Sequence, residues 1–333
     1  MPTEPAAPPS REPIDRLTRA PVTPMAVRAA LRLEVFTLLA QGPMTAEELA
    51  DALGVKPRRL QMLLCQLVVA DFLTLHDERF ANTAMAAHYL VKDAPGYIGA
   101  IHENWTTQWT AQMHTDESIR TDLPQAIIDF NQMSPALSGF LKSLHGNAMA
   151  TGRGLAKNPS FASAERVVDI AGGSGGVAIG LCQELPHLFV TVVDLPSVVP
   201  TARQMVSEAA LADRITVETA DLLEQPFSGR FDIAIARALF QVLSAENCEI
   251  AARNIAAAIP CGGELFVIGH VLDDSGLSPE NSVAQNVVFL NCFDEGQAYK
   301  ESQYREWLTN AGFVEITRKP ESQGRSLISA RKA

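Results

Sequence analysis

The sequence predicts a protein in two parts, a helical unit followed by a doubly wound α/β domain. After about residue 160, short apolar runs rich in β-branched residues alternate with helical stretches, which is typical of a parallel sheet covered on both faces. Before residue 94 the pattern is helical and closes with two short strand-like runs. The length of 333 residues also exceeds that of a typical single domain.

Composition and charge restrict the class of protein. Hydrophobic residues make up 47% of the chain and charged residues 20%, an ordinary globular composition. The net charge of -11 argues against a nucleic-acid partner, since phosphates repel an acidic surface. No apolar run is long enough for a transmembrane helix, and the N-terminus has no signal-peptide core. Five cysteines without a C-x-x-C motif suit reduced thiols and give no metal framework, so we expect a soluble, cytoplasmic protein without a metal.

The N-terminal part is expected to begin with a Pro-rich disordered lead over residues 1–23 and to fold as a domain over residues 24–93. Apolar residues at helical spacing predict a helix over residues 26–42. A later helix begins at Pro57, a residue that suits the first turn. Residues 72–83 follow as two short strands joined by a turn.

A further helix is predicted between these two, from Thr45 to Gly54. Thr45 and Glu48 stand at capping-box spacing, and Gly54 suits a helix C-terminus. Helix, turn, helix and ribbon together indicate a winged-helix unit. Such a unit either binds DNA or forms a dimer. We favour dimerisation, because the helix after Pro57 is too apolar for a DNA groove and the chain is acidic.

Residues 94–160 are predicted to be a helical segment rich in polar and aromatic side chains. This segment is either a linker that packs the two domains together or a lid that supplies specificity groups to a ligand site; the sequence is compatible with both. Its chemically notable residues are His102, Asn104, Trp105, Gln108, Trp109, His145, Asn147, Met149 and Arg153.

The domain over residues 161–333 opens with a strand, a glycine-rich turn and a helix. Gly172 and Gly173 let the backbone turn sharply and approach a ligand, and helix N-terminal amides favour negative charge. A tight turn without a ligand gives the same pattern. Acids at the ends of successive strands favour a nucleotide: Asp194 suits ribose hydroxyls, and Asp221 suits an adenine edge. Asp169 lies inside the end of the first strand, where its carboxylate can hold the loop or meet an ammonium group.

Six motifs in order resemble the class I methyltransferase core: VVDIAGGSGG, VVDLP, ETADLLE, FDIAIARALF, IPCGGELFVIGHV and WLTNAGF. With the preceding helical domain, they resemble the small-molecule O-methyltransferase family, which includes plant caffeate-type and bacterial tailoring enzymes. The resemblance implies a Rossmann-like seven-stranded sheet, a winged-helix dimerisation domain, a homodimer and S-adenosylmethionine as cofactor. A dinucleotide is the alternative cofactor, since GSGGVA also satisfies G-x-G-x-x-A. The implied cofactor set is Met149, Asp169, Gly172, Gly173, Asp194, Leu195, Asp221, Leu222 and Arg237.

The sequence departs from this family in the loop after the fourth strand. The family has a histidine base there, and ALFQVL places Gln241 at that position. Ala298 stands where the family has the glutamate that orients the histidine. A hydroxyl acceptor benefits from a base, whereas a thioether sulfur has no proton to lose. We therefore expect S-methylation of a small thioether such as 4-methylthio-2-hydroxybutyrate, by proximity and exclusion of water.

Three other functions remain open at this stage. They are O-methylation of a phenol or carboxylate, a winged-helix regulator that senses S-adenosylmethionine without catalysis, and a dinucleotide oxidoreductase. Gln241 is expected to position substrate through its amide rather than act as a base. Phe289 and Phe293 are candidates for packing around the sulfonium. His270 follows the fifth strand, but its neighbours do not resemble a base motif. The other candidate substrate contacts are His102, Trp105, Gln108, His145, Asn291 and Tyr299.

Overall fold

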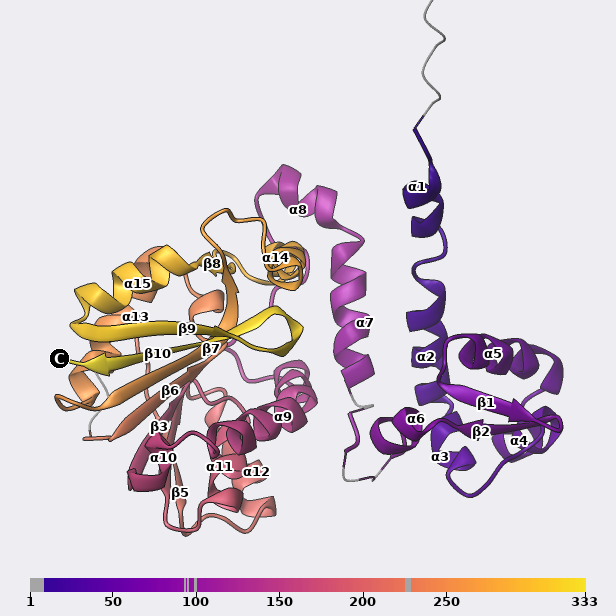
Figure 1. The fold of residues 1–333 in the computed structure, drawn as a ribbon, viewed down its shortest axis with the longest axis horizontal. Helices are drawn as coiled ribbons and strands as arrows, with labels where there is room; N and C mark the ends of the chain where they lie inside the picture. The colour runs from indigo at the N-terminus through magenta and orange to yellow at the C-terminus, as the bar shows by residue number, and fades with distance from the viewer. Residues whose placement is uncertain (1–8, 93, 95, 99–100, 225–228) are drawn as a thin grey trace, which may run out of the picture. The chain divides into compact units, whose positions relative to one another are not determined.

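The computed structural model describes residues 9–92, 94, 96–98, 101–224 and 229–333, without the side chains of residues 101–104 and 323 (Figure 1). The chain divides into two compact units, Met1–His102 and Glu103–Ala333. Helix α7 (Ile101–Gln112) crosses this division. Among the described helices, none is both long and apolar enough to span a membrane.

The first unit consists of short helices and one two-stranded ribbon. Its elements are α1 (Glu12–Leu17), α2 (Val22–Arg32), α3 (Val35–Leu39), α4 (Ala46–Leu53), α5 (Pro57–Val69), β1 (Leu73–His76), β2 (Arg79–Asn82) and α6 (Ala84–Tyr89). The ribbon is antiparallel and pairs Leu73 with Asn82. Phe36, Leu64 and Phe80 are almost fully buried, so helices and ribbon share one small core.

The predicted ends of the helix between Thr45 and Gly54 are confirmed. Thr45 and Glu48 form a capping box at the start of α4, and Gly54 closes the helix at φ 64°. The helix expected over residues 26–42 is instead two helices, because Glu34 adopts a left-handed φ of 57° between α2 and α3. The disordered lead expected over residues 1–23 is wrong in part, since Glu12–Leu17 form α1 and α2 begins at Val22.

The second unit is a three-layer α/β domain. Its elements are α8 (Thr115–Thr121), α9 (Pro135–Leu155), α10 (Ser160–Ser163), β3 (Arg166–Ile170), α11 (Gly176–Glu184), β4 (Phe189–Asp194), α12 (Val199–Glu208), β5 (Ile215–Thr219), β6 (Ile233–Arg237), the 3-10 turn η1 (Phe240–Val242), α13 (Ala245–Ala258), β7 (Glu264–Leu272), α14 (Glu280–Cys292), β8 (Tyr299–Lys300), α15 (Glu301–Asn310), β9 (Phe313–Pro320), the 3-10 turn η2 (Ser322–Gly324) and β10 (Arg325–Lys332).

The strand order across the sheet is β5-β4-β3-β6-β7-β10-β9, with the two-residue strand β8 paired to β7. Strands β3 to β7 run parallel, whereas β10 lies antiparallel between β7 and β9. The direction of strand succession reverses between β3 and β6, where open parallel sheets bind their ligands beyond the carboxyl ends of the strands. The Rossmann-like sheet and its antiparallel terminal pair of strands are therefore confirmed.

Helices cover both faces of this sheet (Figure 1). One face packs against α9, α11 and α12 through residues that include Val167, Ile235 and Phe266. The other face packs against α13 and α15 through residues that include Val168 and Val267. Neighbouring residues of one strand thus pack into the cores on opposite faces of the sheet, because side chains alternate in direction along a strand.

Helices α9 and α11 approach each other with glycine at the contact. A Cβ atom on Gly152 would lie 2.2 Å from the carbonyl oxygen of Val177, and one on Gly180 would lie 2.3 Å from the carbonyl oxygen of Met149. No side chain fits at these separations, so α9 is held against the helix that follows the glycine-rich turn.

Candidate active site

Three ionisable side chains lie along the carboxyl edge of the sheet, on the face covered by α9. Asp169, Arg237 and His270 stand on the neighbouring strands β3, β6 and β7. Asp169 pairs with Ile235 and Arg237 with Ile268, so each side chain lies two residues further along the next strand. With a strand spacing of about 4.8 Å and two residues of advance, successive Cα atoms are roughly 8 Å apart. The three groups form one diagonal row.

The glycine-rich turn begins directly after Asp169. Ala171 has a left-handed φ of 50° and Gly173 one of 59°. A Cβ atom on Gly172 would lie 2.8 Å from Oδ2 of Asp169 and 2.8 Å from Val192, so the turn lies directly against the carboxylate. The sharp turn predicted from the glycines is confirmed, and it lies against the carboxyl group of Asp169.

The carboxyl group of Asp169 is fully buried, and neither of its oxygens has a hydrogen-bond partner among the described residues. Burial raises its pKa to about 7, while the positive charge of Arg237 lowers it. A buried carboxylate without donors is unfavourable unless a ligand supplies them. Asp169 therefore marks a place where a cationic or hydrogen-bond-donating ligand group belongs.

Two further acids lie at the ends of neighbouring strands. Asp194 accepts hydrogen bonds from the backbone N–H of Gly173 at 2.7 Å and of Leu195 at 2.8 Å. Burial raises the pKa of Asp194 to about 6, and these two donors oppose the rise. Asp221 is partly exposed and accepts a bond from the N–H of Leu223 at 2.9 Å. Both carboxylates keep free lone pairs for a ligand.

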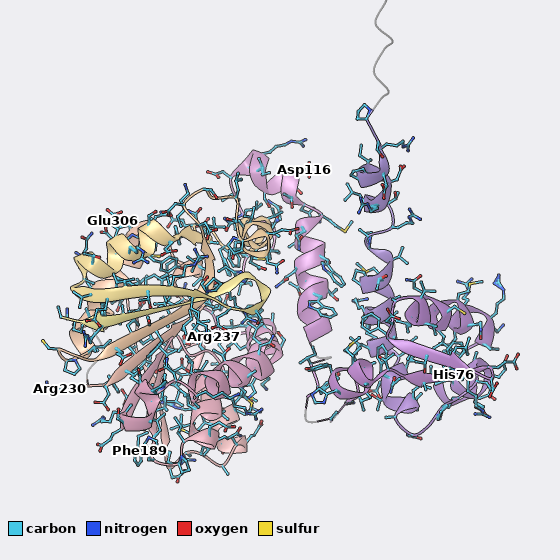
Figure 2. The ribbon with its side chains drawn as sticks, viewed as in Figure 1. His76, Asp116, Phe189, Arg230, Arg237 and Glu306 are labelled. Carbon is cyan, nitrogen blue, oxygen red and sulfur yellow. The ribbon has the colours of Figure 1, made fainter. Side chains whose placement is uncertain are left out.

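Arg237 ends β6 and is held from α9 (Figure 2). Its Nε donates to Oγ1 of Thr151 at 3.3 Å. Burial lowers the pKa of Arg237 to about 10, with the charge of Arg325 adding to the effect and Asp169 opposing it. The guanidinium stays charged at neutral pH and lies between the other two groups of the row. Thr151 was not singled out from the sequence, because its role depends on how α9 packs.

Helix α9 also carries two predicted ligand contacts, Met149 and His145. Met149 is partly buried against the core on the α11 side. Nδ1 of His145 lies 2.9 Å from Oγ of Ser174, a buried residue of the glycine-rich turn. Burial lowers the pKa of His145, so its imidazole is neutral at neutral pH. His145 therefore lies against the glycine-rich turn, at the cofactor end of the site. Its predicted contact with substrate stays a prediction.

Gln241 lies in the 3-10 turn after β6 with 9% of its surface exposed. Its Oε1 accepts the backbone N–H of His270 at 3.2 Å. It is therefore a buried residue attached to the end of β7, and not a surface residue of a loop. Ala298 is buried as well, and its backbone N–H donates to Oδ1 of Asn286 at 2.6 Å.

Aromatic rings continue from His270 toward α9. His270 meets the ring of Phe289 edge-on at 5.9 Å, and Phe289 lies 5.3 Å from Phe293. Phe293 stacks on Phe130 at 6.3 Å. Phe289 stands on α14 and is only 4% exposed, whereas Phe293, directly after this helix, and Phe130 are partly exposed. The rings of Phe293 and Phe130 therefore form an aromatic surface beside the edge of the sheet, and the buried Phe289 contacts both Phe293 and His270.

Two predicted substrate contacts are corrected. Tyr299 is 1% exposed, and its hydroxyl donates to the carbonyl of Leu243 at 2.6 Å. Asn291 is fully buried; its Oδ1 accepts from Ser118, and its Nδ2 donates to Thr115 and to the carbonyl of Val287. These polar atoms are used within the fold, which argues against contact with a substrate.

The remaining predicted substrate contacts lie on α7. Trp105 and Trp109 are partly buried and face each other at 5.8 Å, and the backbone oxygen of Gln108 accepts a bond from Gln112. None of these contacts reaches the row at the sheet edge within the described residues, so their substrate role stays a prediction. The side chain of His102 lies outside the described residues.

These residues fit S-adenosylmethionine. The unpartnered carboxylate of Asp169 and the charged Arg237 lie side by side, which suits a group with one ammonium and one carboxylate. Asp194 and Asp221 lie at the next strand ends, where an acid suits ribose hydroxyls and an adenine amino group. Fold and site together define an S-adenosylmethionine-dependent methyltransferase.

Comparison with known proteins identifies the family. The family model for the O-methyltransferase domain matches residues 130–314, more than half of the chain, and that for the O-methyltransferase dimerisation domain matches residues 16–92. The chain belongs to the O-methyltransferase family. It is therefore an enzyme of the methyltransferase class, which overturns the alternatives of a dinucleotide oxidoreductase and of a non-catalytic regulator.

Relatives within this family methylate different atoms. The 3-hydroxy-5-methyl-1-naphthoate 3-O-methyltransferase of Streptomyces sahachiroi is 31% identical over 296 residues, covering 86% of this chain and 85% of the relative. The L-tyrosine C(3)-methyltransferase of Streptomyces lavendulae is 24% identical over 86% of this chain and 82% of its own. Human N-acetylserotonin methyltransferase in complex with SAM shares the fold, with a TM-score of 0.86, 21% identity and coverage of 99% and 100%.

Proposed function

We propose that this enzyme transfers a methyl group from S-adenosylmethionine to a hydroxyl group of a small aromatic molecule. The observation that carries this proposal is the aromatic surface of Phe293 and Phe130, which the buried Phe289 joins to His270 in the row of ionisable groups. Flat rings pack well against such a surface, because aromatic pairs favour offset and edge-on contacts. The relative at 31% identity, named for a hydroxynaphthoate, supports an aromatic acceptor.

The residues at the sheet edge divide into those that hold the cofactor and those that meet the acceptor. S-adenosylmethionine supplies a methyl group made electrophilic by its sulfonium. Asp169 and Arg237 hold the amino-acid end, and Asp194 and Asp221 hold the nucleoside. Tight packing of α9 on α11 keeps Arg237 in place through Thr151.

On the acceptor side, the enzyme aligns a lone pair with the methyl group and excludes water. Phe293 and Phe130 hold the ring of the acceptor. The amide oxygen of Gln241 is taken by the end of β7, which leaves its NH₂ group to donate toward the acceptor. Gln241 therefore positions the acceptor and the strand end together.

S-methylation of a thioether is the second candidate. Glutamine at position 241 and alanine at position 298 favour it, since a thioether needs no base. The relatives named above are O- and C-methyltransferases, which favours the hydroxyl acceptor over the thioether.

We also propose that the enzyme is a homodimer formed through residues 16–92, the range matched by the dimerisation family model. Exposed apolar side chains in this range, among them Val22, Met25 and Val69, support a contact that covers them. Sedimentation equilibrium of the full chain and of Val69→Asp tests this: the variant is expected to shift toward monomer, and a monomeric full chain would refute the dimer.

The test of the function is turnover of methyl-labelled S-adenosylmethionine over a panel of acceptors. Hydroxynaphthoates and simple phenols represent the first candidate, their methoxy analogues serve as matched controls without a proton, and 4-methylthio-2-hydroxybutyrate represents the second. We expect label in hydroxylated aromatics and none in the methoxy controls. Label in the thioether alone would replace the first candidate by the second.

A further inference from the structure

We propose that His270 is the proton acceptor for the acceptor hydroxyl group. The base thus lies at the end of β7, although the loop position that resembles the family's histidine holds Gln241. This inference rests on the proposed O-methylation and adds the residue that removes the proton.

The place of His270 in the sheet supports this role. It stands on the same face as Asp169 and Arg237, two residues beyond the pairing partner of Arg237. Since Asp169 and Arg237 lie at the cofactor end, the next position of the row lies on the acceptor side. The ring is partly exposed and edge-on to the buried Phe289, which packs on Phe293 of the aromatic surface. A hydroxylated ring packed there brings its oxygen to the imidazole.

The hydrogen bonds of Ser282 fix the tautomer of His270. Oγ of Ser282 donates its only proton to the carbonyl oxygen of Gly324 at 2.6 Å. In its 3.4 Å contact with Nδ1 of His270, the hydroxyl must therefore accept, so Nδ1 carries the proton. Nε2 then holds a lone pair and has no hydrogen-bond partner among the described residues. This is the arrangement that a general base requires.

Burial and nearby charges keep His270 neutral, and the charges also favour an anionic acceptor. Burial and the charges of Arg325 and Arg237 lower its pKa to about 4. The same two guanidinium groups also lower the pKa of a hydroxyl group placed beside them. Their electrostatic effect on proton transfer from hydroxyl to imidazole therefore largely cancels, while the neutral imidazole is fully available at neutral pH.

The reaction step balances as follows. The O–H bond of the acceptor breaks and its proton passes to Nε2 of His270. The oxygen lone pair forms a bond to the methyl carbon, and the carbon–sulfur bond breaks with its electron pair remaining on sulfur. The products are a methyl ether and S-adenosylhomocysteine, and the imidazolium of His270 returns its proton to water after product release.

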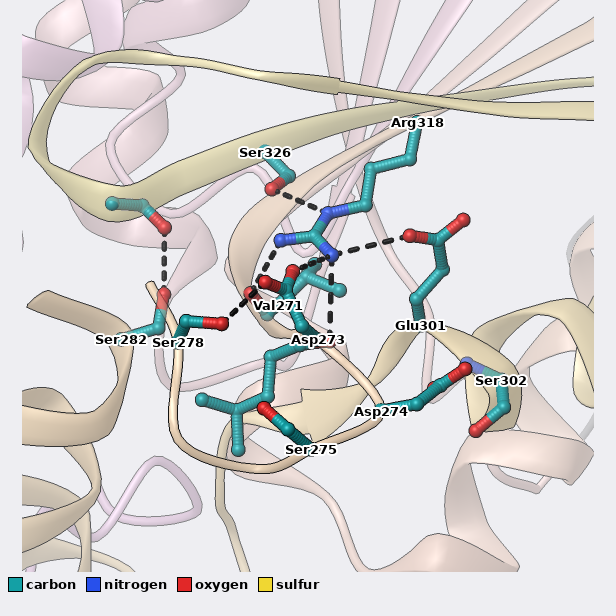
Figure 3. Close-up of polar contacts among 12 residues, drawn as sticks. Val271, Asp273, Asp274, Ser275, Ser278, Ser282, Glu301, Ser302, Arg318 and Ser326 are labelled. Atoms are coloured by element: carbon teal, nitrogen blue, oxygen red, sulfur yellow. Dashed lines mark hydrogen bonds and ion pairs between the residues drawn. The ribbon is translucent and has the colours of Figure 1, made fainter. Parts of the chain in front are cut away.

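Residues around the end of β7 hold His270 in position. Gln241 accepts its backbone N–H. Arg318, only 7% exposed, reaches from β9 and donates to the carbonyl oxygens of Val271 at 2.9 Å and of Leu272 at 3.4 Å (Figure 3). The same guanidinium pairs with Asp273 at 2.7 Å and so fixes the segment that leads to α14. Hydrogen bonds to the backbone of His270 and of the two residues after it thus fix this end of β7.

The experiment compares wild type with His270→Gln on two hydroxylated acceptors of one ring type, a phenol of ordinary pKa and a nitro-substituted phenol that is ionised at neutral pH. Loss of a general base lowers rates by roughly 100- to 10,000-fold. We expect His270→Gln to lose kcat in this range on the ordinary phenol and less than about 10-fold on the ionised one. His187→Gln, an exposed histidine in the turn between α11 and β4, is the control and is expected to match wild type on both.

Two readouts other than turnover separate this role from a structural one. Binding of S-adenosylhomocysteine and thermal unfolding are expected to be nearly unchanged in His270→Gln. On the ordinary phenol, the rate of this variant is expected to rise tenfold per pH unit toward the pKa of the phenol. Equal losses on both phenols, or unchanged kcat on the ordinary one, would overturn the role of His270. Absence of any hydroxyl turnover by wild type would instead refute the proposed function.

Discussion

Replacing Asp169 by asparagine tests whether its buried carboxylate is a ligand group rather than a structural one. Its pKa is raised from 3.8 to about 7 in the folded protein. One pKa unit corresponds to 1.36 kcal/mol, so ionised Asp169 lowers the free energy of unfolding by at most about 4 kcal/mol.

The sign follows from proton binding. Between pH 3.8 and 7 the folded state holds more protons at this site than the unfolded state, so stability falls as the pH rises through this range. Above pH 7 the effect is constant. We therefore expect Asp169→Asn without cofactor to be more stable than wild type at pH 8, by roughly 2 kcal/mol after a cost of about 2 kcal/mol for burying the amide, and roughly 1 kcal/mol less stable than wild type near pH 4.5, where ionisation of Asp169 costs only about 1 kcal/mol.

Cofactor binding is expected to change in the opposite direction. A hydrogen bond to a charged group is worth about 1.5–3 kcal/mol, so the variant should bind S-adenosylhomocysteine at least 10-fold more weakly. Denaturant unfolding at both pH values and calorimetric titration measure the two effects. Asp51→Asn, on the exposed face of α4, is the control. A variant that is less stable at pH 8 and binds the cofactor as wild type does would refute the reasoning.

Three further outcomes follow from the packing of the second unit. Gly152→Ala should lower the free energy of unfolding by about 1–3 kcal/mol, because the added methyl group would lie 2.2 Å from a carbonyl oxygen of α11. Gly154→Ala, with open space around its Cβ, should stabilise the protein slightly. Equal effects of the two substitutions in denaturant melts would contradict this. Arg318→Met should lower the free energy of unfolding by about 1–3 kcal/mol, because the carbonyl oxygens of Val271 and Leu272 lose their donor, and should lower kcat. The exposed Arg305→Met should change the melting midpoint little. Gln241→His should not raise turnover; a tenfold gain would show that the loop, and not the end of β7, is where the base belongs.

The parts of the fold that depend on short sequence signals were predictable. The strands β3 to β7 follow from β-branched runs, and the turn after Asp169 follows from its glycines. Helix ends such as the one at Thr45 were also predictable, since a helix cap depends only on residues within one turn. The break at Glu34 was not, because nothing in an apolar helical pattern marks a left-handed residue.

The site was predictable only where a motif carried it. Asn291 looked free in the sequence, yet its partner Ser118 lies 173 residues away. The row of Asp169, Arg237 and His270 depends on the register between strands, which cannot be derived from the sequence. Because side chains alternate between the two faces of a strand, the sequence does place His270 on the same face as Phe266 and Ile268. No recognisable motif surrounds His270, so this alternation alone did not identify it as a site residue.

The most direct test of the enzyme's activity is transfer of labelled methyl groups from S-adenosylmethionine to a hydroxynaphthoate and to its methoxy analogue, with the wild-type enzyme at neutral pH. Label in the methyl ether of the hydroxynaphthoate, and none in the methoxy analogue, is expected. Cofactor binding without label in any hydroxylated aromatic, or label in a thioether alone, would contradict O-methylation as the function.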